Sequence, residues 1–398
     1  MKRQIALCLF FGALAVIPVF AERVAMPQFD IPTAAANGFG GSYTAYTDNV
    51  FSLLVNPAAM MRVQQRSFFT LATSVFSPQS LFGITSSLMN IDASHFSGSF
   101  GDIADTLSEK EGRIAIGFEL REFPFSIAWV ANGFGFGLWS RSFVKAEIIG
   151  DYVRVNAYSD VILPVGFAFK ILEMERHSVD AGFTLKPFVR VIASENVVIT
   201  DLLDDATIDP AVPLLVGGGF DIGFLYRWAA GLQVGFTFKD IFTRGAVAAN
   251  LTENKDASKY YVPFTMNAGV SYSARPFYFL GLTVAADWRD LGNIFNQNDY
   301  LNNRNCLLDF GMGLEVSFFD SIYLRAGMKE LLPAAGLGFS LGPVKIDLAY
   351  YGRQFGYEPG QLSTAVADLS IAIRPDAKQR NWKWTRGSLL GLFGAGNR

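Results

Sequence analysis

Residues 308–318 read LDFGMGLEVSF, and this stretch decides the fold. An apolar side chain occupies every second position: Leu308, Phe310, Met312, Leu314, Val316 and Phe318. The positions between them hold Asp309, Gly311, Gly313, Glu315 and Ser317. Successive side chains of a β-strand point to opposite faces, so the stretch predicts a strand with one apolar and one polar face.

The same two-residue period recurs along most of the chain, at 230–239, 264–274, 281–289, 322–329 and 363–374. Two uncharged stretches, 67–91 and 123–140, are long enough for a membrane helix. Prolines, glycines and hydroxyl residues interrupt both, and neither offers the roughly 20 apolar residues that a spanning helix needs. Asn132-Gly133 between apolar runs is instead a hairpin signal. The 51% of hydrophobic residues is therefore carried by strands.

The connections separate a membrane barrel from a soluble sandwich, because both would bury one face of each strand. Short links near 171–177, 227–229, 275–277, 319–320 and 342–343 alternate with long ones near 194–213, 242–262, 291–304 and 353–362, and only the link near 331–334 is short where a long one is due. Tight turns at one end and long loops at the other are typical of outer-membrane barrels. We predict an all-β, antiparallel transmembrane barrel over residues 66–374, with about 14 strands, or 16 if 67–88 adds a hairpin.

The first 21 residues form the predicted export signal. Lys2 and Arg3 precede an apolar run that ends in Val19-Phe20-Ala21, which is typical of a secretory signal peptide cleaved after Ala21. A membrane anchor is the alternative, and Pro18 argues against it. Removal of the signal takes the net charge from −3 to −5, so nothing indicates nucleic-acid binding. The mature chain keeps one cysteine, Cys306, which excludes an intramolecular disulfide.

Residues 22–65 do not alternate, and we expect them to precede the barrel as a separate unit. The run Gly38-Phe39-Gly40-Gly41 predicts a flexible, tight backbone. A short helix is expected from Thr44 to Leu54 and is stopped by Asn56-Pro57, because the residue before proline is disfavoured in helical geometry. Asn56 then caps a second short helix that has Pro57 at its first position. In the simpler interpretation this unit is only a helix-turn-helix that leads into the first strand.

This unit also resembles a known family. The pattern Gly38-x-Gly40-Gly41-Ser42-Tyr43-x-Ala45, followed by Asp48-Asn49 and Asn56-Pro57-Ala58-Ala59, is similar to the N-terminal hatch signature of FadL-type barrels, and the glycine- and aromatic-rich barrel is similar in style to FadL-like paralogues of treponemes, which are spirochetes. Asn49 stands where the family has a second acid, and Ala59 where glycine is common. The barrel segments match by pattern alone, so the resemblance assigns no ligand contact in the strands.

The resemblance implies transport of long-chain fatty acids or similar hydrophobic compounds across the outer membrane. A hatch would plug the barrel, shift when an apolar ligand binds, and let the ligand leave sideways into the membrane lipids. Its motif residues here are Gly38, Gly40, Gly41, Asp48, Asn56, Pro57 and Ala58. The alternatives are a surface adhesin, a barrel of a secretion complex, or a general porin; no oligomeric state is indicated.

Charged residues occupy the predicted inward faces: Arg154, Asp160, Asp180, Lys186, Arg190, Asp221, Arg227, Lys239, Asp287, Arg289, Asp309, Glu315, Arg325, Lys329, Lys345, Asp347 and Asp368. Since an unpaired charge buried there is costly, the favoured interpretation is that they pair across a polar lumen. The functional alternative is that one or two arginines, among Arg154, Arg190, Arg227 and Arg325, hold a ligand carboxylate.

No catalytic arrangement is evident. The histidines, His95 and His177, have no recognisable nucleophile–base setting, and no metal cluster, phosphate loop or nucleotide fingerprint is present. We therefore predict a protein that is not an enzyme and needs no cofactor or metal. Short helices are expected at 99–110 and 196–206. Residues 375–398 form a basic, aromatic tail that is expected to be a loosely ordered end.

Overall fold

The computed structural model describes residues 23–29, 32–67, 69–77, 114–121, 126–149, 152–198, 212–251, 259–294, 304–360 and 363–374. The signal peptide, the tail, the predicted helix at 99–110 and His95 lie outside these ranges. No helix in the described ranges is long and apolar enough to cross a membrane.

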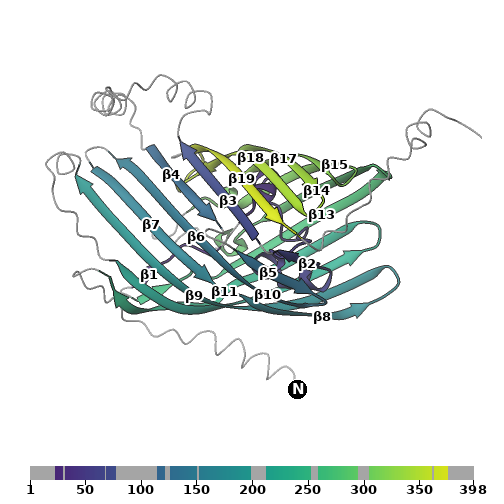
Figure 1. The fold of residues 1–398 in the computed structure, drawn as a ribbon, viewed down its shortest axis with the longest axis horizontal. Coiled ribbons are helices and arrows are strands. Elements are labelled where there is room, and N and C mark those ends of the chain that lie inside the picture. The colour runs from purple at the N-terminus through teal and green to yellow at the C-terminus, as the bar shows by residue number, and fades with distance from the viewer. Residues whose placement is uncertain are drawn as a thin grey trace, which may run out of the picture.

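The strands form one antiparallel sheet that closes on itself (Figure 1). In chain order they are β2 (Gln64–Ser67), β3 (Phe69–Ser77), β4 (Ile114–Arg121), β5 (Ile127–Ala131), β6 (Phe134–Ile149), β7 (Tyr152–Ile162), β8 (Val165–Glu173), β9 (His177–Val198), β10 (Pro213–Trp228), β11 (Leu232–Asn250), β12 (Lys259–Tyr261), β13 (Thr265–Phe277), β14 (Leu280–Trp288), β15 (Phe310–Phe318), β16 (Ile322–Lys329), β17 (Leu332–Leu341), β18 (Val344–Gln354) and β19 (Ser363–Ile373). The last strand, β19, pairs with β3 from Ala365↔Ser77 to Ile373↔Phe69. This pairing is the closing seam of the barrel.

The wall of the barrel is fourteen strands wide, which is the smaller of the two predicted numbers. Three of these fourteen strands are each divided into two labelled segments: β2 and β3, β4 and β5, and β7 and β8. The two segments of each pair follow one another along the same neighbouring strand. The break between β7 and β8 contains Pro164, which has no N–H to donate to the ladder. Of two further short strands, β12 pairs with the end of β11, and β1 (Arg23–Ala25) pairs in parallel with β12. The possible extra hairpin at 67–88 is one strand, β3, as far as residue 77.

The connections alternate as the sequence predicts. Links at 132–133, 174–176, 229–231, 278–279, 319–321 and 342–343 are tight and share one end of the barrel, which we call the turn end. The opposite end, the loop end, carries the longer links and two short ones, at residues 150–151 between β6 and β7 and at Glu330 and Leu331, which both have positive φ. Asn132 and Gly133 also have positive φ and form the predicted hairpin. The predicted helix at 196–206 is wrong at its start, because β9 continues to Val198.

Apolar side chains point outward around the whole circumference. Large exposed examples come from strands all around the ring, including Phe118, Phe136, Phe169, Leu185, Phe224, Phe236, Val270, Val284, Leu314, Leu324, Leu337 and Leu348. Buried charged side chains share the inner face with glycine and hydroxyl residues. Closure satisfies every strand edge within the wall, which hydrocarbon requires. The sheet is therefore a membrane barrel, and the apolar faces do not meet in a sandwich core.

Candidate functional site: the filled lumen

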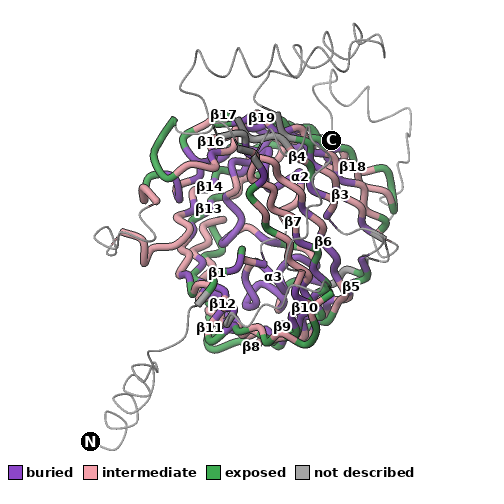
Figure 2. Tube along the Cα trace, turned by 90° about the vertical axis from the view of Figure 1, so that its left-hand side faces the viewer, coloured by how far each residue is buried: buried purple, intermediate pink, exposed green. Residues whose placement is uncertain are grey.

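Residues 32–63, which we call the inner segment, lie inside the ring of strands (Figure 2). The segment contains α2 (Ala34–Gly38), α3 (Ser52–Val55) and the 3-10 helix η1 (Pro57–Met61). Helix α2 contacts β16 to β19 on one side, and η1 contacts β8, β9 and β10 on the other. The inner segment therefore bridges the lumen from wall to wall.

The local structure of the inner segment differs in part from the prediction. Thr33 caps α2, accepting a hydrogen bond from Ala36 N at 3.1 Å. This helix was not predicted, and the helix expected from Thr44 to Leu54 is wrong, since only α3 forms, beyond a turn. The second short helix is confirmed: the Asn56 side chain accepts from Ala58 N at 3.2 Å, and Pro57 begins η1.

Asn37 joins α2 to two walls of the barrel. Its Nδ2 donates to Asp368 Oδ2 at 2.8 Å, and its Oδ1 accepts from Lys329 Nζ at 2.7 Å. Asp368 also pairs with Arg121, whose other terminal nitrogen donates to the Pro32 carbonyl. All of these side chains except that of Pro32 are buried. The charges of the wall thus hold the start of the inner segment.

The middle of the inner segment is held by two carboxylates. Thr44 N donates to Asp287 Oδ2 at 2.7 Å, and the Tyr46 hydroxyl donates to Glu315 Oε1 at 2.9 Å. Glu315 in turn pairs with Arg325 Nε at 2.6 Å. Acids on β14 and β15 therefore serve as acceptors for the inner segment.

Asn56 is completely buried and connects three chain segments. Its Nδ2 donates to the Thr44 carbonyl at 2.9 Å and to the Phe224 carbonyl on β10 at 3.3 Å. Its Oδ1 caps η1. This side chain consequently fixes both the shape of the inner segment and its position against the wall.

Glycines on the inner face of the wall let the inner segment approach the strand backbone. A Cβ placed on Gly223 would lie 2.2 Å from Asn56 Oδ1 and 3.0 Å from Pro57 N. One placed on Gly182 would lie 2.6 Å from Pro57 C, and one on Gly336 would lie 3.1 Å from Gly38 Cα. Strands β6, β8, β11, β13, β15 and β16 offer the same close approach through Gly135, Gly166, Gly235, Gly269, Gly311, Gly313 and Gly327. We call these ten residues the glycine belt.

The predicted hatch residues do not all lie in the same environment. Gly38, Gly40, Asn56, Pro57 and Ala58 are buried, Gly41 is half-buried, and Asp48 is exposed. Gly40 and Gly41 have φ values of +70° and +77°, which only glycine adopts readily. A Cβ on Gly40 would in addition lie 2.0 Å from Met312 O. The glycines of the motif are thus needed for both the turn and the contact with the wall.

One half of the lumen is apolar. Val130, Trp139, Ile162, Phe188 and Leu215 point inward from the wall and are almost completely buried. Against them pack side chains of the inner segment, including Val50, Phe51, Leu53, Leu54 and Met60. A barrel that conducts polar solutes lines its lumen with polar groups. Here this half of the wall is apolar instead, and the inner segment covers it.

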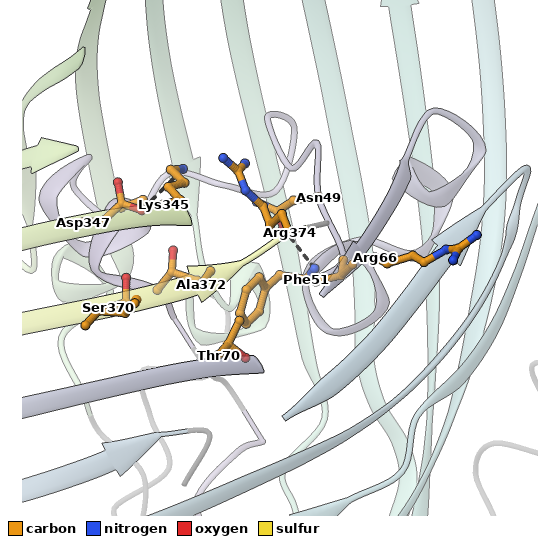
Figure 3. A pocket seen from close by; sticks show the side chains of 13 residues that line it. Asn49, Phe51, Arg66, Thr70, Lys345, Asp347, Ser370, Ala372 and Arg374 are labelled. Carbon is orange, nitrogen blue, oxygen red and sulfur yellow. Dashed lines mark hydrogen bonds and ion pairs between the residues drawn. The ribbon is translucent and has the colours of Figure 1, made fainter. Parts of the chain in front are cut away.

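The cavity shown in Figure 3 lies between the inner segment and the turn-end parts of β3, β18 and β19. Its lining includes Asn49, Phe51, Lys345, Asp347 and Arg374, and its volume is about 40 Å³. A cavity of about 150 Å³ is what accommodates a benzene molecule. The cavity has room for a few water molecules at most and is too small for a hydrocarbon ligand while the inner segment stays in place.

The four arginines considered for a ligand carboxylate have different surroundings. Arg190 pairs with Asp160 through two hydrogen bonds of 2.5 and 2.6 Å, and Arg325 contacts Glu315 and Asp347 at 2.6 and 2.8 Å. Arg154 donates to Asn196 in an exposed setting. The Arg227 side chain has no ion pair or hydrogen bond within the described ranges, and its Nε is buried. The pairing interpretation therefore holds for Arg190 and Arg325, and Arg227 stands apart.

Sequence reasoning missed several lumen charges. Glu119, Arg121 and Arg141 are buried on the inner face of β4 and β6, where Glu119 Oε1 lies 2.5 Å from Arg141 Nε. Glu119 and Arg121 alternate with Phe118 and Leu120, and this signal could have revealed them. Two predicted inward charges, Arg289 and Asp309, lie instead at the loop end, beyond β14 and in the 3-10 helix η4 (Cys306–Asp309).

Residues 23–29, the leading segment, continue the filling of the lumen toward the loop end. β1 pairs in parallel with β12, and Phe29 packs against Phe188 with ring centroids 4.5 Å apart. Arg190 donates to the Pro27 carbonyl at 2.7 Å, and Arg141 to the Gln28 carbonyl at 3.1 Å. These paired arginines therefore also hold the chain backbone in the lumen.

The described residues include no group of three His, Cys, Asp or Glu side chains that could hold a metal ion. His177 lies at the turn end, where its Nδ1 is 2.8 Å from the Tyr226 hydroxyl.

No family model and no curated protein matches the chain. Among solved structures it is similar to the toluene transporter TodX of Pseudomonas putida, with 11% identity, a TM-score of 0.49, and coverage of 88% of this chain and 100% of that one. It is also similar to the CymD monoaromatic hydrocarbon channel, with 10% identity, a TM-score of 0.48, and coverage of 86% and 97%. A FadL homologue of Pseudomonas aeruginosa has 12% identity, a TM-score of 0.46, and coverage of 89% and 99%.

Proposed function

We propose that this chain carries hydrophobic compounds, such as long-chain fatty acids, across the outer membrane, with the inner segment as a hatch. The observation that carries this proposal is the apolar half of the lumen, covered by a segment that the wall holds through a limited set of hydrogen bonds. When the hatch shifts, wall side chains that it covers, such as Trp139 beside Phe51, become available to an apolar ligand, whose burial is favourable by about 25 cal/mol per Å².

The polar contacts of the hatch explain how it could shift without unfolding the wall. Two of the wall carboxylates that bind it keep their own cations: Asp368 has Arg121, and Glu315 has Arg325. These pairs therefore stay compensated when Asn37 and Tyr46 move away. The alternative of a general porin has no support in this geometry, since the lumen is filled from wall to wall.

The orientation follows from the class of fold. Barrels of this kind place their short turns in the periplasm and their long loops outside the cell. The turn end is accordingly periplasmic, and the signal peptide cleaved after Ala21 would direct export.

A disulfide between hatch and wall tests the proposal. The ideal Cβ position on Gly269 lies 3.0 Å from Thr44 Cβ, a little below the usual separation of about 3.8 Å in a disulfide. Thr44→Cys with Gly269→Cys, in a Cys306→Ser background, would lock the hatch after a small adjustment in which the Asp287 carboxylate turns aside. The readout is uptake of labelled palmitate by cells of a host that lacks its own fatty-acid transporter.

We expect uptake to fall at least tenfold when the disulfide forms and to recover on reduction. Each single-cysteine variant, treated with the same oxidant, is the matched control. Full uptake by protein whose disulfide is verified by mass spectrometry would show that the hatch need not move. Uptake of palmitate no higher than that of the empty host would reject the fatty-acid assignment.

A further inference from the structure

A cleft opens at the turn end between the β8–β9 and β10–β11 turns, and we call it the rim cleft. Its volume is about 320 Å³, and its lining includes Arg62, Met174, Ser178, Arg227, Trp228 and Gln233. Arg62 follows η1 at the end of the inner segment, whereas Arg227 and Trp228 end β10. The cleft therefore extends from the lumen to the outer rim of the barrel.

The lumen side of the rim cleft holds Arg62 and Arg227, and the lining also includes Arg176 and the acids Glu173 and Glu175, of which Glu173 pairs with Lys170 at 2.7 Å. Arg227 has no contacting acid within the described part of the chain, and the neighbouring Arg62 opposes its charge. One acid, Asp180, lies near both, and it contacts only Arg62, at 3.4 Å. Arg62 also donates to the Ser178 hydroxyl at 2.7 Å. The Arg227 guanidinium group is therefore available for an anion that enters the cleft.

The rim side of the cleft is apolar. Trp228 is 42% exposed and Met174 is 59% exposed. The His177 ring stacks on Trp228, with centroids 6.4 Å apart and an interplanar angle of 2°, and its Nδ1 lies 2.8 Å from the Tyr226 hydroxyl. The rings are thus held as a flat platform at the rim, where tryptophan is typical of a membrane–water interface.

We propose that the rim cleft binds an anionic amphiphile, with its carboxylate or phosphate head at Arg227 and Arg62 and its chain on Trp228 and Met174. Guanidinium groups bind carboxylate and phosphate oxygens through paired hydrogen bonds, which suits either head. Where the amphiphile is a fatty acid, this inference rests on the proposed function and gives the periplasmic end of the path a docking point. Where it is a phospholipid, the site is independent of transport.

The site is tested by isothermal titration calorimetry on purified protein in a neutral detergent. The measured quantity is the affinity for each of three ligands: dodecanoate, dodecyl phosphate and dodecanol. Arg227→Gln is the test variant, and Arg154→Gln is the matched control, since Arg154 is an arginine in an exposed contact. We expect Arg227→Gln to weaken dodecanoate binding at least tenfold while dodecanol binding and the control stay unchanged. An equal loss for dodecyl phosphate extends the site to phospholipid heads; no loss for it restricts the site to carboxylates.

Unchanged dodecanoate affinity in Arg227→Gln would overturn the rim cleft, and so would an equal loss in Arg154→Gln or with dodecanol. If the wild type binds dodecyl phosphate but no carboxylate, the rim cleft stands and the fatty-acid function fails. A second measurement uses the wild-type protein, so it does not depend on the folding of the variant. Dodecanoate with a photoreactive diazirine near its methyl end should cross-link within residues 174–178 or 226–233. Cross-links confined to other segments would exclude the site.

Discussion

At the scale of single residues, Asn56 shows how a predicted motif obtains its physical role. The sequence predicts it as a helix cap, and the structure confirms the cap. The same side chain also bonds to Thr44 and to β10, more than one hundred residues away in the chain. No local pattern reveals the contact with β10, because it depends on which strand lies beside the segment.

Asn56→Ala should therefore destabilise the protein by about 1–3 kcal/mol, since it leaves two carbonyls and a helix N–H without a partner in a buried site. Thermal unfolding in detergent measures the effect. Asn196→Ala is the control, because Asn196 makes one exposed hydrogen bond, to Arg154. Equal melting temperatures of the two variants would contradict the role given to Asn56.

Glu330 gives a second residue-scale prediction, at the loop end. Burial alone would raise its pKa, but the charges of Arg289 and Arg304, at 3.6 and 3.3 Å, lower the pKa to about 2. A carboxylate whose pKa is lowered by folding stabilises the folded state at any pH above its ordinary pKa of 4.5. That contribution is lost as the pH falls toward the lowered pKa of about 2.

Glu330→Gln should cost about 3 kcal/mol at pH 7, and the difference from the wild type should vanish by about pH 2. Unfolding measured from pH 7 to pH 2 on both proteins gives this difference directly and cancels the other acids, including Asp309, whose pKa burial raises to about 6. A difference that does not depend on pH would show that Glu330 acts through hydrogen bonds to Gln354 alone.

At the scale of elements, the strands were predictable and the inner segment was not. A strand records its two environments, lipid and lumen, in alternate residues, so β15 can be recognised in LDFGMGLEVSF. The inner segment lies between walls on every side, and its helices are only four or five residues long. Isolated helices of this length are unstable, so contacts with the wall decide where they form. This is why α2 was missed and why the helix from Thr44 was wrong.

The glycine belt is the element-scale feature that fits wall and inner segment together. On β10, Gly223 and Gly218 are five residues apart and lie on opposite faces: buried Gly223 faces Asn56 and Pro57, whereas Gly218 is exposed and a Cβ there would meet nothing within 4 Å. Alternation identifies glycines on an inner face, but it does not tell which of them touch another chain segment.

Gly223→Ala should displace η1 from the wall and make the inner segment more accessible. Limited proteolysis, with cleavage sites in residues 32–63 mapped by mass spectrometry, measures this displacement, and planar-bilayer recording should show a larger ion current. Gly218→Ala is the matched control on the same strand and should behave as the wild type. The prediction fails if both variants are equally resistant to the protease.

At the scale of the whole molecule, the chain passes through its own barrel. The leading segment starts beside β12 near the loop end, the inner segment crosses the lumen, and β2 begins at the turn end. The number of strands and the alternation of links could be read from the sequence. The path through the lumen could only be expected from the family resemblance, because residues 22–65 carry no periodicity that states where they lie.

This path predicts that the start of the mature chain is reachable from outside the cell. In a Cys306→Ser background, Val24→Cys should react with a membrane-impermeant maleimide on intact cells, since Val24 is 39% exposed near the loop end. Tyr278→Cys, in the turn between β13 and β14 and 73% exposed, is the control and should react only after the outer membrane is permeabilised. The reverse pattern would invert the orientation.

The closing seam between β3 and β19 also constrains the order of assembly. Residues 32–63 precede the first strand of the wall, yet they end up surrounded by all fourteen strands. If β3 and β19 paired early, these residues would have to thread into a barrel that had already closed. Pairing of strands so distant in sequence is also slow. The strands should therefore first form an open, curved sheet around the inner segment. Pairing of β3 with β19 should then close the barrel as the last and rate-limiting step.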